Sequence, residues 1–281
     1  MTHPGELLKR GNLYAGKELG QNFLSNPATA QMIVDRTGIN RETFVLEIGP
    51  GLGALTVPLA KSAARVVAVE KDRRLIPYLE AELAEAGVEN VSIINANILK
   101  TDIAEIAGEN RLTVMGNLPY NISSQILFQL VKTRSVVDAA FLMFQKELAV
   151  RLMAAPGGRD FSRLSAVVQY AARISHLAEI RPNSFFPRPD VDSTVLRFDF
   201  FDDQGLGPEE EDLLFAVIKA AFSKRRKTLK NAMSGGELGL KKPVAGEILE
   251  AAGIDPVRRA ETLSIKEFTA LGEAAWRILK E

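Results

Sequence analysis

Short apolar runs alternate with segments of helical periodicity over the first half of the chain. The apolar runs lie at residues 43–48, 65–69, 91–94, 112–115 and 139–144, and each has the length of a buried strand. Amphipathic segments of helical spacing lie among them, at residues 26–38, 54–61, 72–87, 103–107 and 123–132. Strands that alternate with helices predict βαβ units, so the expected fold class is α/β with a parallel, doubly wound sheet.

Polar residues and glycines mark the ends of two of these helices. Asn26 followed by Pro27 is typical of an N-cap and a first helical turn, and Gly38 is typical of the residue after a helix. By the same reasoning, Asp72 is expected to cap the helix that runs to Gly87.

The pattern changes after residue 144. Helices are expected at 145–153 and 161–172, and strands at 174–180 and 193–200 flank a loop rich in proline. Residues 201–209, FDDQGLGPE, have the composition of a linker, and beyond them helical segments alone follow, at 210–222, 225–232, 243–252 and 265–279. We therefore expect a sheet domain at residues 1–204, with 1–25 as an N-terminal arm, and a small helical domain at 205–281.

Composition excludes several classes of site. The chain has 281 residues and no cysteine, which excludes disulfides, zinc–thiolate sites, iron–sulfur clusters and cysteine nucleophiles, and no metal site is predicted. Lys plus Arg (35) equals Asp plus Glu (35), so net charge indicates no partner. No run approaches the ~18 apolar residues of a membrane span, and the first residues lack an apolar signal core. We expect a cytoplasmic protein that does not enter a membrane.

A glycine-rich turn follows the first predicted strand and opens a helix, at residues 47–54, EIGPGLGA. Ligands bind outside the carboxyl ends of parallel strands, and glycines let the backbone approach a ligand closely. Two cofactors fit this position. Gly49, Gly51 and Ala54 satisfy the dinucleotide fingerprint G-x-G-x-x-A, with Glu70 about 20 residues on to bind a ribose, which would suit an oxidoreductase that uses NAD.

The acidic residue of the same turn favours the other cofactor. Glu47 at the strand end would repel a pyrophosphate but suits an amino-bearing, cationic ligand. Together with Gly49, Gly51 and Gly53 it resembles E-x-G-x-G-x-G, the first motif of the S-adenosylmethionine-dependent methyltransferases. S-adenosylmethionine is therefore the cofactor that we expect, with S-adenosylhomocysteine as its product.

Two further strand ends supply polar groups to the same edge of the sheet. A carboxylate at Glu70, next to Lys71, can accept both hydroxyls of a ribose. Asn97, next to Ile98, follows the third strand where an adenine would lie, and its amide can donate and accept at the edge of the base.

Residues 117–120, NLPY, end the fourth strand and resemble the [D/N/S]-P-P-[Y/F] motif of methyltransferases that modify the exocyclic amino group of a base. The side-chain oxygen of Asn117 and the carbonyl of Leu118 can hold the two hydrogens of an adenine N6, which favours build-up of its lone pair toward a methyl donor. Pro119 stiffens the turn, and Tyr120 offers a ring face to a flipped-out base.

Four more segments extend the resemblance over nearly the whole chain: KELGQNFL at 17–24, FFPRPDVDS at 185–193, FSKRRKTLKN at 222–231 and RRAETL at 258–263. Together they resemble the ribosomal RNA adenine N6,N6-dimethyltransferases, and among these the small-subunit branch. The family usually has Asp at the position of Asn97, but Asn can still accept from adenine N6, so we expect the cofactor to bind.

This resemblance implies a Rossmann-like methyltransferase sheet with a small C-terminal helical domain. It places the methionine end of the cofactor beside Gln21, Asn22, Phe23 and Leu24, and puts Phe185 over the target base, opposite Tyr120. It also implies contacts of the helical domain with RNA through five basic residues, namely Lys224, Arg225, Arg226, Lys227 and Lys230.

The activity that the resemblance implies is dimethylation of N6 on two adjacent adenosines, in a hairpin near the 3′ end of 16S rRNA. The partner would be this RNA in the small ribosomal subunit or its assembly precursor, and the protein is expected to act as a monomer. Three alternatives stay open: a 23S rRNA adenine N6-methyltransferase of the antibiotic-resistance type, a non-catalytic ribosome-assembly factor that binds RNA, and the NAD-binding oxidoreductase.

Overall fold

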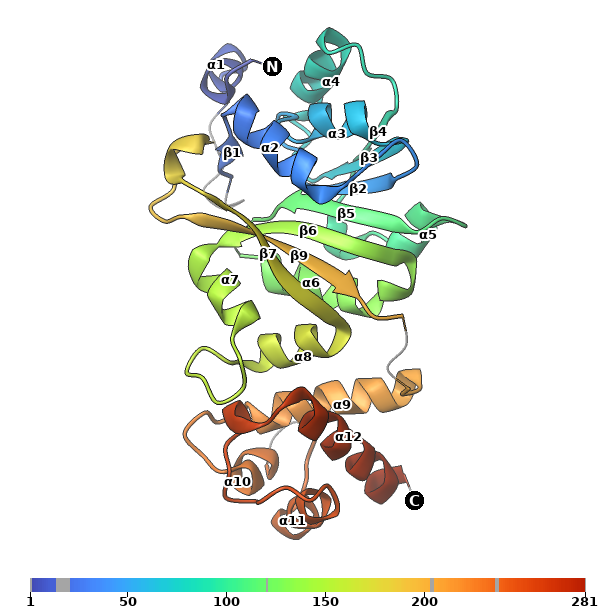
Figure 1. Cartoon of the computed structure of the whole chain (residues 1–281), viewed down its shortest axis with the longest axis vertical. Helices are drawn as coiled ribbons and strands as arrows, with labels where there is room; N and C mark the ends of the chain where they lie inside the picture. Colours follow the sequence, from blue (N-terminus) through green and yellow to red (C-terminus); the bar gives the residue numbers. More distant parts are fainter. Residues whose placement is uncertain (1, 14–20, 120, 203–204, 236–237, 281) are drawn as a thin grey trace. The chain divides into compact units, whose positions relative to one another are not determined.

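The computed structural model describes residues 2–13, 21–119, 121–202, 205–235 and 238–280 (Figure 1). The chain forms two compact units. Unit 1 comprises Met1–Ala149 and Arg173–Phe200, and unit 2 comprises Val150–Ala172 and Phe201–Glu281.

Unit 1 is built on a seven-stranded sheet with strand order β4-β3-β2-β5-β6-β9-β7. The first five strands in this order are parallel, and β9 runs antiparallel to β6. This confirms the expected α/β class. The bounds of the strands are β2 Phe44–Ile48, β3 Arg65–Glu70, β4 Val91–Asn95, β5 Leu112–Asn117, β6 Val137–Gln145, β7 Ala172–Ile180 and β9 Ser193–Phe200.

The strand order reverses between β2 and β5. The chain proceeds outward from β2 through β3 to β4, and then returns to place β5 on the other side of β2. In open α/β sheets, ligands bind at such a switch point, outside the carboxyl ends of the strands. This topology brings the ends of β2, β3 and β5 together at one edge, where the sequence places its glycine-rich turn, Glu70 and Asn117.

Apolar residues bury both faces of this sheet. On one face, Ile33 of α2 and Leu59 of α3 share a core cluster with Val45 of β2, Met115 of β5 and Phe141 of β6. Figure 1 shows α6 on the opposite side of the strands from α2, α3 and α4. Strands covered on both faces read as continuous apolar runs, which is why the sequence predicts them well. These helices are α2 Pro27–Thr37, α3 Thr56–Ser62, α4 Ile76–Glu85, α5 Ile103–Ala107 and α6 Ser123–Lys132.

The two expected caps have different outcomes. The side chain of Asn26 accepts the Thr29 N–H at 3.1 Å, and Gly38 ends α2 in the left-handed region with φ 76°, as predicted. The cap expected from Asp72 is wrong, because α4 begins only at Ile76. Asp72 instead accepts the backbone N–H of Arg74 at 3.1 Å, in the turn before the helix.

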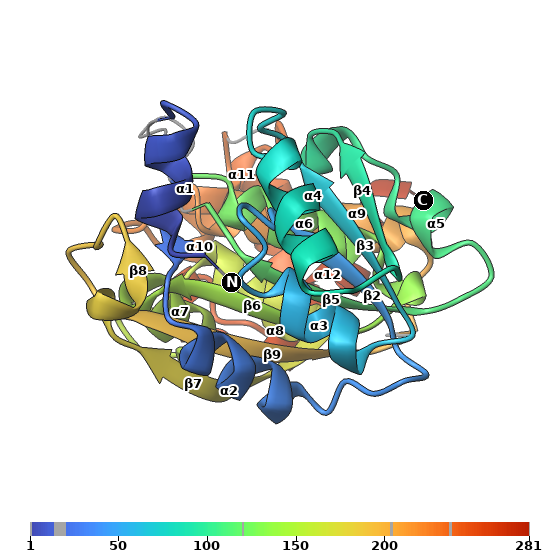
Figure 2. The same ribbon diagram turned by 90° about the horizontal axis from the view of Figure 1, so that it is seen from above.

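Three short elements of unit 1 have no sequence signal. They are the helix α1 Pro4–Arg10 and the strands β1 Phe23–Leu24 and β8 Phe185–Phe186, which pair antiparallel. Leu7 and Leu8 of α1 pack with Phe23, Leu52 and Leu75. Helix α1 lies beside β8 (Figure 2), and the rings of His3 and Phe186 meet edge to face with centroids 5.5 Å apart.

Unit 2 is helical. Its core includes the ring of Phe222, which lies between those of Phe161 and Phe268, with centroids 6.2 and 5.7 Å away. Its helices are α8 Arg163–Ala171, α9 Pro208–Ala221, α10 Leu229–Met233, α11 Lys242–Ala251 and α12 Ile265–Lys280, and it also holds the end of α7 Lys146–Met153.

Residues 150–172 group with these helices, whereas the expected boundary at 204 assigns them to the sheet domain. The physical reason is that α8 turns its apolar residues toward α9, where the rings of Tyr170 and Phe215 meet at 5.7 Å. A second difference concerns α10, which begins at Leu229 and not at Arg225. The basic run at 224–227 therefore lies in the turn that precedes this helix.

Close packing of α12 on α9 gives a stability prediction. A Cβ added at Gly272 would lie 2.9 Å from Cδ1 and 3.0 Å from Cβ of Leu214. We expect Gly272→Ala to lower the free energy of unfolding by about 1–3 kcal/mol despite the better helix propensity of Ala. The control is Gly246→Ala in α11, where the nearest atom is the end of the flexible Lys230 side chain at 3.1 Å. Denaturant unfolding should show no loss in the control, and equal stabilities of the two variants would contradict the prediction.

Candidate active site

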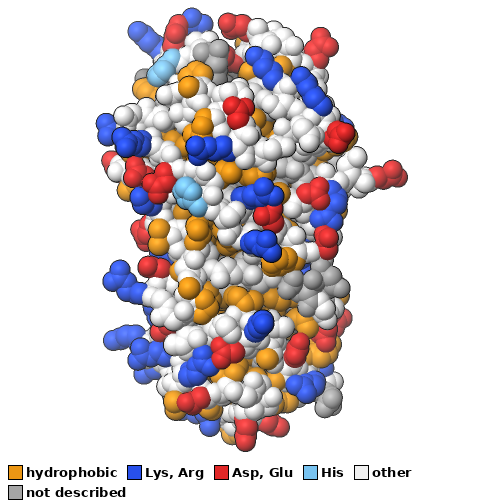
Figure 3. Space-filling view, viewed as in Figure 1, with side chains coloured by type: hydrophobic (Ala, Val, Ile, Leu, Met, Phe, Trp, Pro, Cys, Tyr) orange, Lys and Arg blue, Asp and Glu red, His pale blue; other side chains and the backbone are white. Residues whose placement is uncertain are grey.

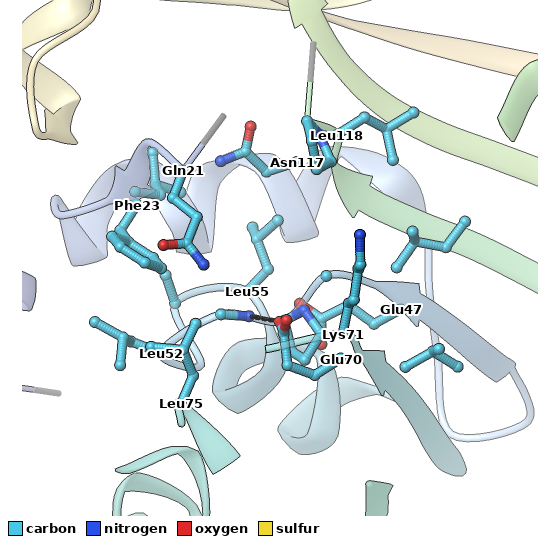
Figure 4. Close-up of a pocket in the computed structure, with 18 of the residues that line it drawn as sticks. Gln21, Phe23, Glu47, Leu52, Leu55, Glu70, Lys71, Leu75, Asn117 and Leu118 are labelled. Atoms are coloured by element: carbon cyan, nitrogen blue, oxygen red, sulfur yellow. Dashed lines mark hydrogen bonds between the residues drawn. The ribbon is translucent and has the colours of Figure 1, made fainter. Parts of the chain in front are cut away.

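A cavity opens at the switch point of the unit 1 sheet (Figure 4). Nearly all the predicted cofactor residues line it, although they come from the N-terminal arm, the glycine turn and three strand ends. These lining residues are Gln21, Asn22, Phe23, Leu24, Glu47, Gly49, Gly51, Glu70, Lys71, Asn97, Ile98 and Asn117. Leu118 and Pro119, predicted to hold the target base, line it as well.

The glycine turn that connects β2 to α3 requires glycine for conformational reasons. Gly49 has φ 68° and Gly51 has φ 57°, a region that side chains disfavour. Gly53, also predicted to bind cofactor, is not among the lining residues that the structure describes. Its φ is 88°, and a Cβ there would lie 2.9 Å from Cδ1 of Leu79, so this glycine allows the turn to pack on α4.

The carboxylate of Glu70 links this turn to the end of β3. One oxygen, Oε2, accepts the N–H of Gly51 at 3.0 Å (Figure 4). The other, Oε1, accepts the N–H of Asp72 at 2.7 Å. The side chain is buried, and this burial raises its pKa. Each oxygen keeps a second lone pair, so the carboxylate can accept further hydrogen bonds from a ligand.

Glu47 is the most buried acid of the site, with 1% of its surface exposed. Its Oε2 has no hydrogen-bond partner among the residues that the structure describes. Burial raises the pKa of this carboxyl to about 8, and the nearby charge of Glu70 acts in the same direction. A buried, unpaired carboxyl oxygen that lines a cavity favours a ligand with a hydrogen-bond donor or a positive charge.

The amide of Asn117 has a fixed orientation. Its Nδ2 donates to the carbonyl oxygen of Asn22 at 2.8 Å, and a carbonyl can only accept, so the nitrogen must occupy that position. Its Oδ1 accepts no hydrogen bond from the part of the chain described here, and it remains an acceptor for a ligand. The N–H of Leu118 donates to the Met143 carbonyl at 3.3 Å, which ties the segment to β6.

Asp72, which the sequence predicted to be a helix cap, instead holds the N-terminal arm at the cavity. Gln21 donates from Nε2 to Oδ2 of Asp72 at 3.1 Å. A hydrogen bond from the Arg74 side chain lowers the pKa of Asp72 to about 2, and the bond from Gln21 acts in the same direction. Thr2 and Pro4 also line the cavity, and the sequence missed them because no motif marks them.

The structure does not bring Phe185 to the cavity. Its side chain is 4% exposed and belongs to the core cluster that contains Leu24 and Ile180. The next residue, Phe186, is the exposed one, at 38%. Alternation along β8 explains this, since adjacent side chains of a strand point to opposite faces. Tyr120, its expected partner across the base, lies outside the described residues, as do residues 17–20 of the N-terminal motif.

Four of the five predicted RNA-binding residues are exposed together in the turn between α9 and α10: Lys224, Arg225, Arg226 and Lys227. The guanidinium of Arg225 donates to the backbone carbonyl of Arg159. The fifth, Lys230, is separate from them, because its side chain lies against Gly246 of α11 in a depression that Glu247 and Glu250 also line. Figure 3 shows basic and acidic side chains interspersed over the visible face, in keeping with the zero net charge.

Membrane spans and clustered metal ligands are both absent from the described residues. No helix among them is long and apolar enough to cross a membrane. No group of three or more His, Cys, Asp or Glu side chains among them could hold a metal ion.

Comparison with known proteins decides the family. A family model described as "Ribosomal RNA adenine dimethylase" matches residues 13–271. The chain belongs to this family. Its relatives include "Ribosomal RNA small subunit methyltransferase A" of Desulforapulum autotrophicum, which is 55% identical over 98% of this chain and 97% of its own length. A protein of the same name from Desulfitobacterium hafniense is 44% identical over 96% and 95%.

Solved structures agree with this assignment. A dimethyladenosine transferase from Plasmodium falciparum superposes with a TM-score of 0.76 at 26% identity, over 89% of this chain and 95% of that one. The 23S rRNA methyltransferase ErmE shares the fold, with a TM-score of 0.65 at 22% identity, over 90% of this chain and 99% of its own.

The raised pKa of Glu47 gives a pH prediction. The folded protein keeps the proton on this carboxyl up to about pH 8, whereas the unfolded chain releases it near the ordinary glutamate pKa of 4.5. The folded state therefore binds more protons between these values, and the free energy of unfolding should fall as pH rises through this window, by up to about 1.4 kcal/mol per pH unit.

Glu47→Gln carries a neutral group at every pH and isolates this effect. In denaturant unfolding at intervals from pH 5 to pH 9, the free energy of unfolding of the variant should rise relative to that of wild type as the pH increases. Glu70, whose pKa is also raised, titrates in both proteins, so the difference reports Glu47 together with its electrostatic coupling to Glu70. Stability curves that stay parallel over this pH range would contradict the raised pKa of Glu47.

Proposed function

We propose that this chain binds S-adenosylmethionine in the unit 1 cavity and transfers its methyl group to N6 of adenosines in small-subunit ribosomal RNA, twice on each nitrogen. The observation that carries the proposal is the orientation of Asn117, which presents an acceptor oxygen at the cavity. The names of the relatives support the choice of the small subunit.

The polar groups of the cavity fit this cofactor. The unpaired oxygen of Glu47 suits the ammonium of the methionine part, and the carboxylate of Glu70 suits the ribose hydroxyls. Asn97 and Ile98 would border the adenine. A dinucleotide fits less well, because its pyrophosphate offers neither a hydrogen-bond donor nor a positive charge to the unpaired oxygen of Glu47. When bound, the cofactor supplies an electrophilic methyl group on a positively charged sulfur.

The target nitrogen needs activation by position. An adenine N6 is a poor nucleophile, because its lone pair is delocalised into the ring. If Oδ1 of Asn117 and the carbonyl of Leu118 accept its two hydrogens, the lone pair can build up toward the methyl group. The N6 lone pair then forms the N–C bond as the S–C bond breaks, and the proton leaves the cationic product to water. No general base on the protein is required before transfer.

The basic turn at residues 224–227 is the proposed contact with RNA. Its four side chains are exposed, and it carries no acid, so it can approach phosphates without repulsion. The partner that we propose is 16S rRNA in the small ribosomal subunit or its assembly precursor.

Substitution of Asn117 separates chemistry from binding. Asn117→Ala should lower the rate of methyl transfer by about 100-fold or more, because it removes an acceptor from the reacting nitrogen. The comparison variant is Asn117→Asp, which keeps an acceptor oxygen for the ligand but loses the bond to the Asn22 carbonyl, so its activity should lie between those of wild type and the Ala variant. Both should bind ribosomal particles as wild type does. Transfer of labelled methyl to purified particles measures the rate, and a fully active Ala variant would refute the mechanism.

Neutralisation of the basic turn tests the RNA contact. Lys224→Ala combined with Lys227→Ala should weaken binding to small subunits and reduce the slope of log K against log salt by about one unit for each phosphate that the variant no longer neutralises. The matched control is Lys241→Ala with Lys242→Ala, two exposed cations at the start of α11. Cofactor affinity should be unchanged in both. Equal salt slopes for the two double variants would exclude this turn as the contact.

A further inference from the structure

The turn after β4 forms the end of the cavity where the adenine of the proposed cofactor would lie. Asn97 is half-buried there and serves as the N-cap of the 3-10 helix η2 Ile98–Lys100. Its neighbours Ala96 and Ile98 line the cavity with it, and Ile122 contributes a further apolar side chain. Apolar side chains with a polar group beside them are suited to a planar base.

The side chain of Asn97 has one atom already committed. Its Oδ1 accepts the backbone N–H of Leu99 at 3.1 Å. A backbone N–H can only donate, so the oxygen must stand there, and a flipped amide would set two donors against each other. The Asn97 carbonyl in turn accepts from the N–H of Lys100 at 2.8 Å and from Oγ1 of Thr101 at 3.0 Å, which ties the turn down.

The remaining polar atom of this side chain is Nδ2, a donor. Across the ranges that the structure describes, no residue accepts a hydrogen bond from it. Nδ2 is therefore the uncommitted donor of Asn97, whereas Oδ1 already accepts one bond within its own turn. The sequence alone left both polarities available; the fixed amide leaves Nδ2 without a partner among the described residues, whereas Oδ1 keeps one lone pair beside its bond to Leu99.

The polarity matters because the edge of adenine has two kinds of group. The 6-amino group donates, and it would leave two donors unpaired if it faced Nδ2. The adjacent ring nitrogen N1 accepts. We propose that Asn97 recognises the adenine of S-adenosylmethionine mainly as a donor, from Nδ2 to ring N1, and that any contact of its Oδ1 with the 6-amino group is the weaker of the two. The inference rests on the proposed function, because it concerns the base of that cofactor.

An aspartate at this position would act in the opposite sense. One carboxylate oxygen could keep the bond from the Leu99 N–H, and the other would accept from the 6-amino group. Asn97→Asp is nearly isosteric and is therefore the matched variant with reversed polarity. Asn97→Ser is the second variant, since a serine hydroxyl can cap the Leu99 N–H but carries no amide donor.

The test measures dissociation constants by calorimetry for three ligands: S-adenosylhomocysteine, its 1-deaza analogue, which lacks the N1 acceptor, and its 6-deamino analogue. For the wild type we expect a loss of about tenfold with the 1-deaza analogue and less than about threefold with the 6-deamino analogue. In Asn97→Asp the larger loss should move to the 6-deamino analogue. Asn97→Ser should bind S-adenosylhomocysteine and the 1-deaza analogue within about twofold of each other.

Each other outcome overturns a defined claim. A wild type that is sensitive to the 6-amino group and not to N1 would show that Asn97 presents its oxygen. An Asn97→Ser variant that still discriminates against the 1-deaza analogue as wild type does would assign N1 to another donor. The two wild-type analogue titrations stand even if a variant fails to fold, which thermal unfolding reveals. Failure of S-adenosylhomocysteine itself to bind the wild type would overturn the proposed function, and this inference with it.

Discussion

The bond between the Glu70 carboxylate and the Gly51 N–H is the constraint on which the cavity depends. It joins the end of β3 to the turn after β2, two segments that the parallel sheet already places side by side. The turn can reach the carboxylate because Gly49 and Gly51 adopt positive φ, which a side chain would disfavour. Glu70 also holds the Asp72 N–H, and Asp72 holds Gln21 of the N-terminal arm. A chain of hydrogen bonds thus runs from the sheet to the arm that borders the cavity.

Two asparagines give the cavity its polarity, and backbone groups fix both. The Asn22 carbonyl accepts from Asn117 and leaves an oxygen at the cavity, whereas the Leu99 N–H donates to Asn97 and leaves an amide nitrogen there. The residue type alone could not distinguish these two orientations, because the donor nitrogen and the acceptor oxygen of an amide extend equally far along the side chain. Only the folded backbone leaves an oxygen uncommitted on one asparagine and a nitrogen on the other.

The sequence predicted the sheet and most of the cavity for a physical reason. Buried parallel strands read as apolar runs, and their carboxyl ends meet at one edge, so motifs far apart in sequence could be placed together. Elements of two residues, such as β1 and β8, have no period to detect, and α1 carries no motif. The burial of Phe185 depends on the pairing of β8 with β1, which no local pattern encodes. Likewise, the separation of Lys230 from the other basic residues follows from the packing of α10 on α11.

The most direct test of the account is transfer of labelled methyl from S-adenosylmethionine to small ribosomal subunits that lack the modification, with large subunits as a parallel substrate. Label is expected on the small subunit alone, on N6 of two adjacent adenosines, with two methyl groups on each. Label on the large subunit would contradict it in favour of a resistance-type enzyme. Binding to the small subunit without any label would contradict it in favour of an assembly factor built on a methyltransferase fold.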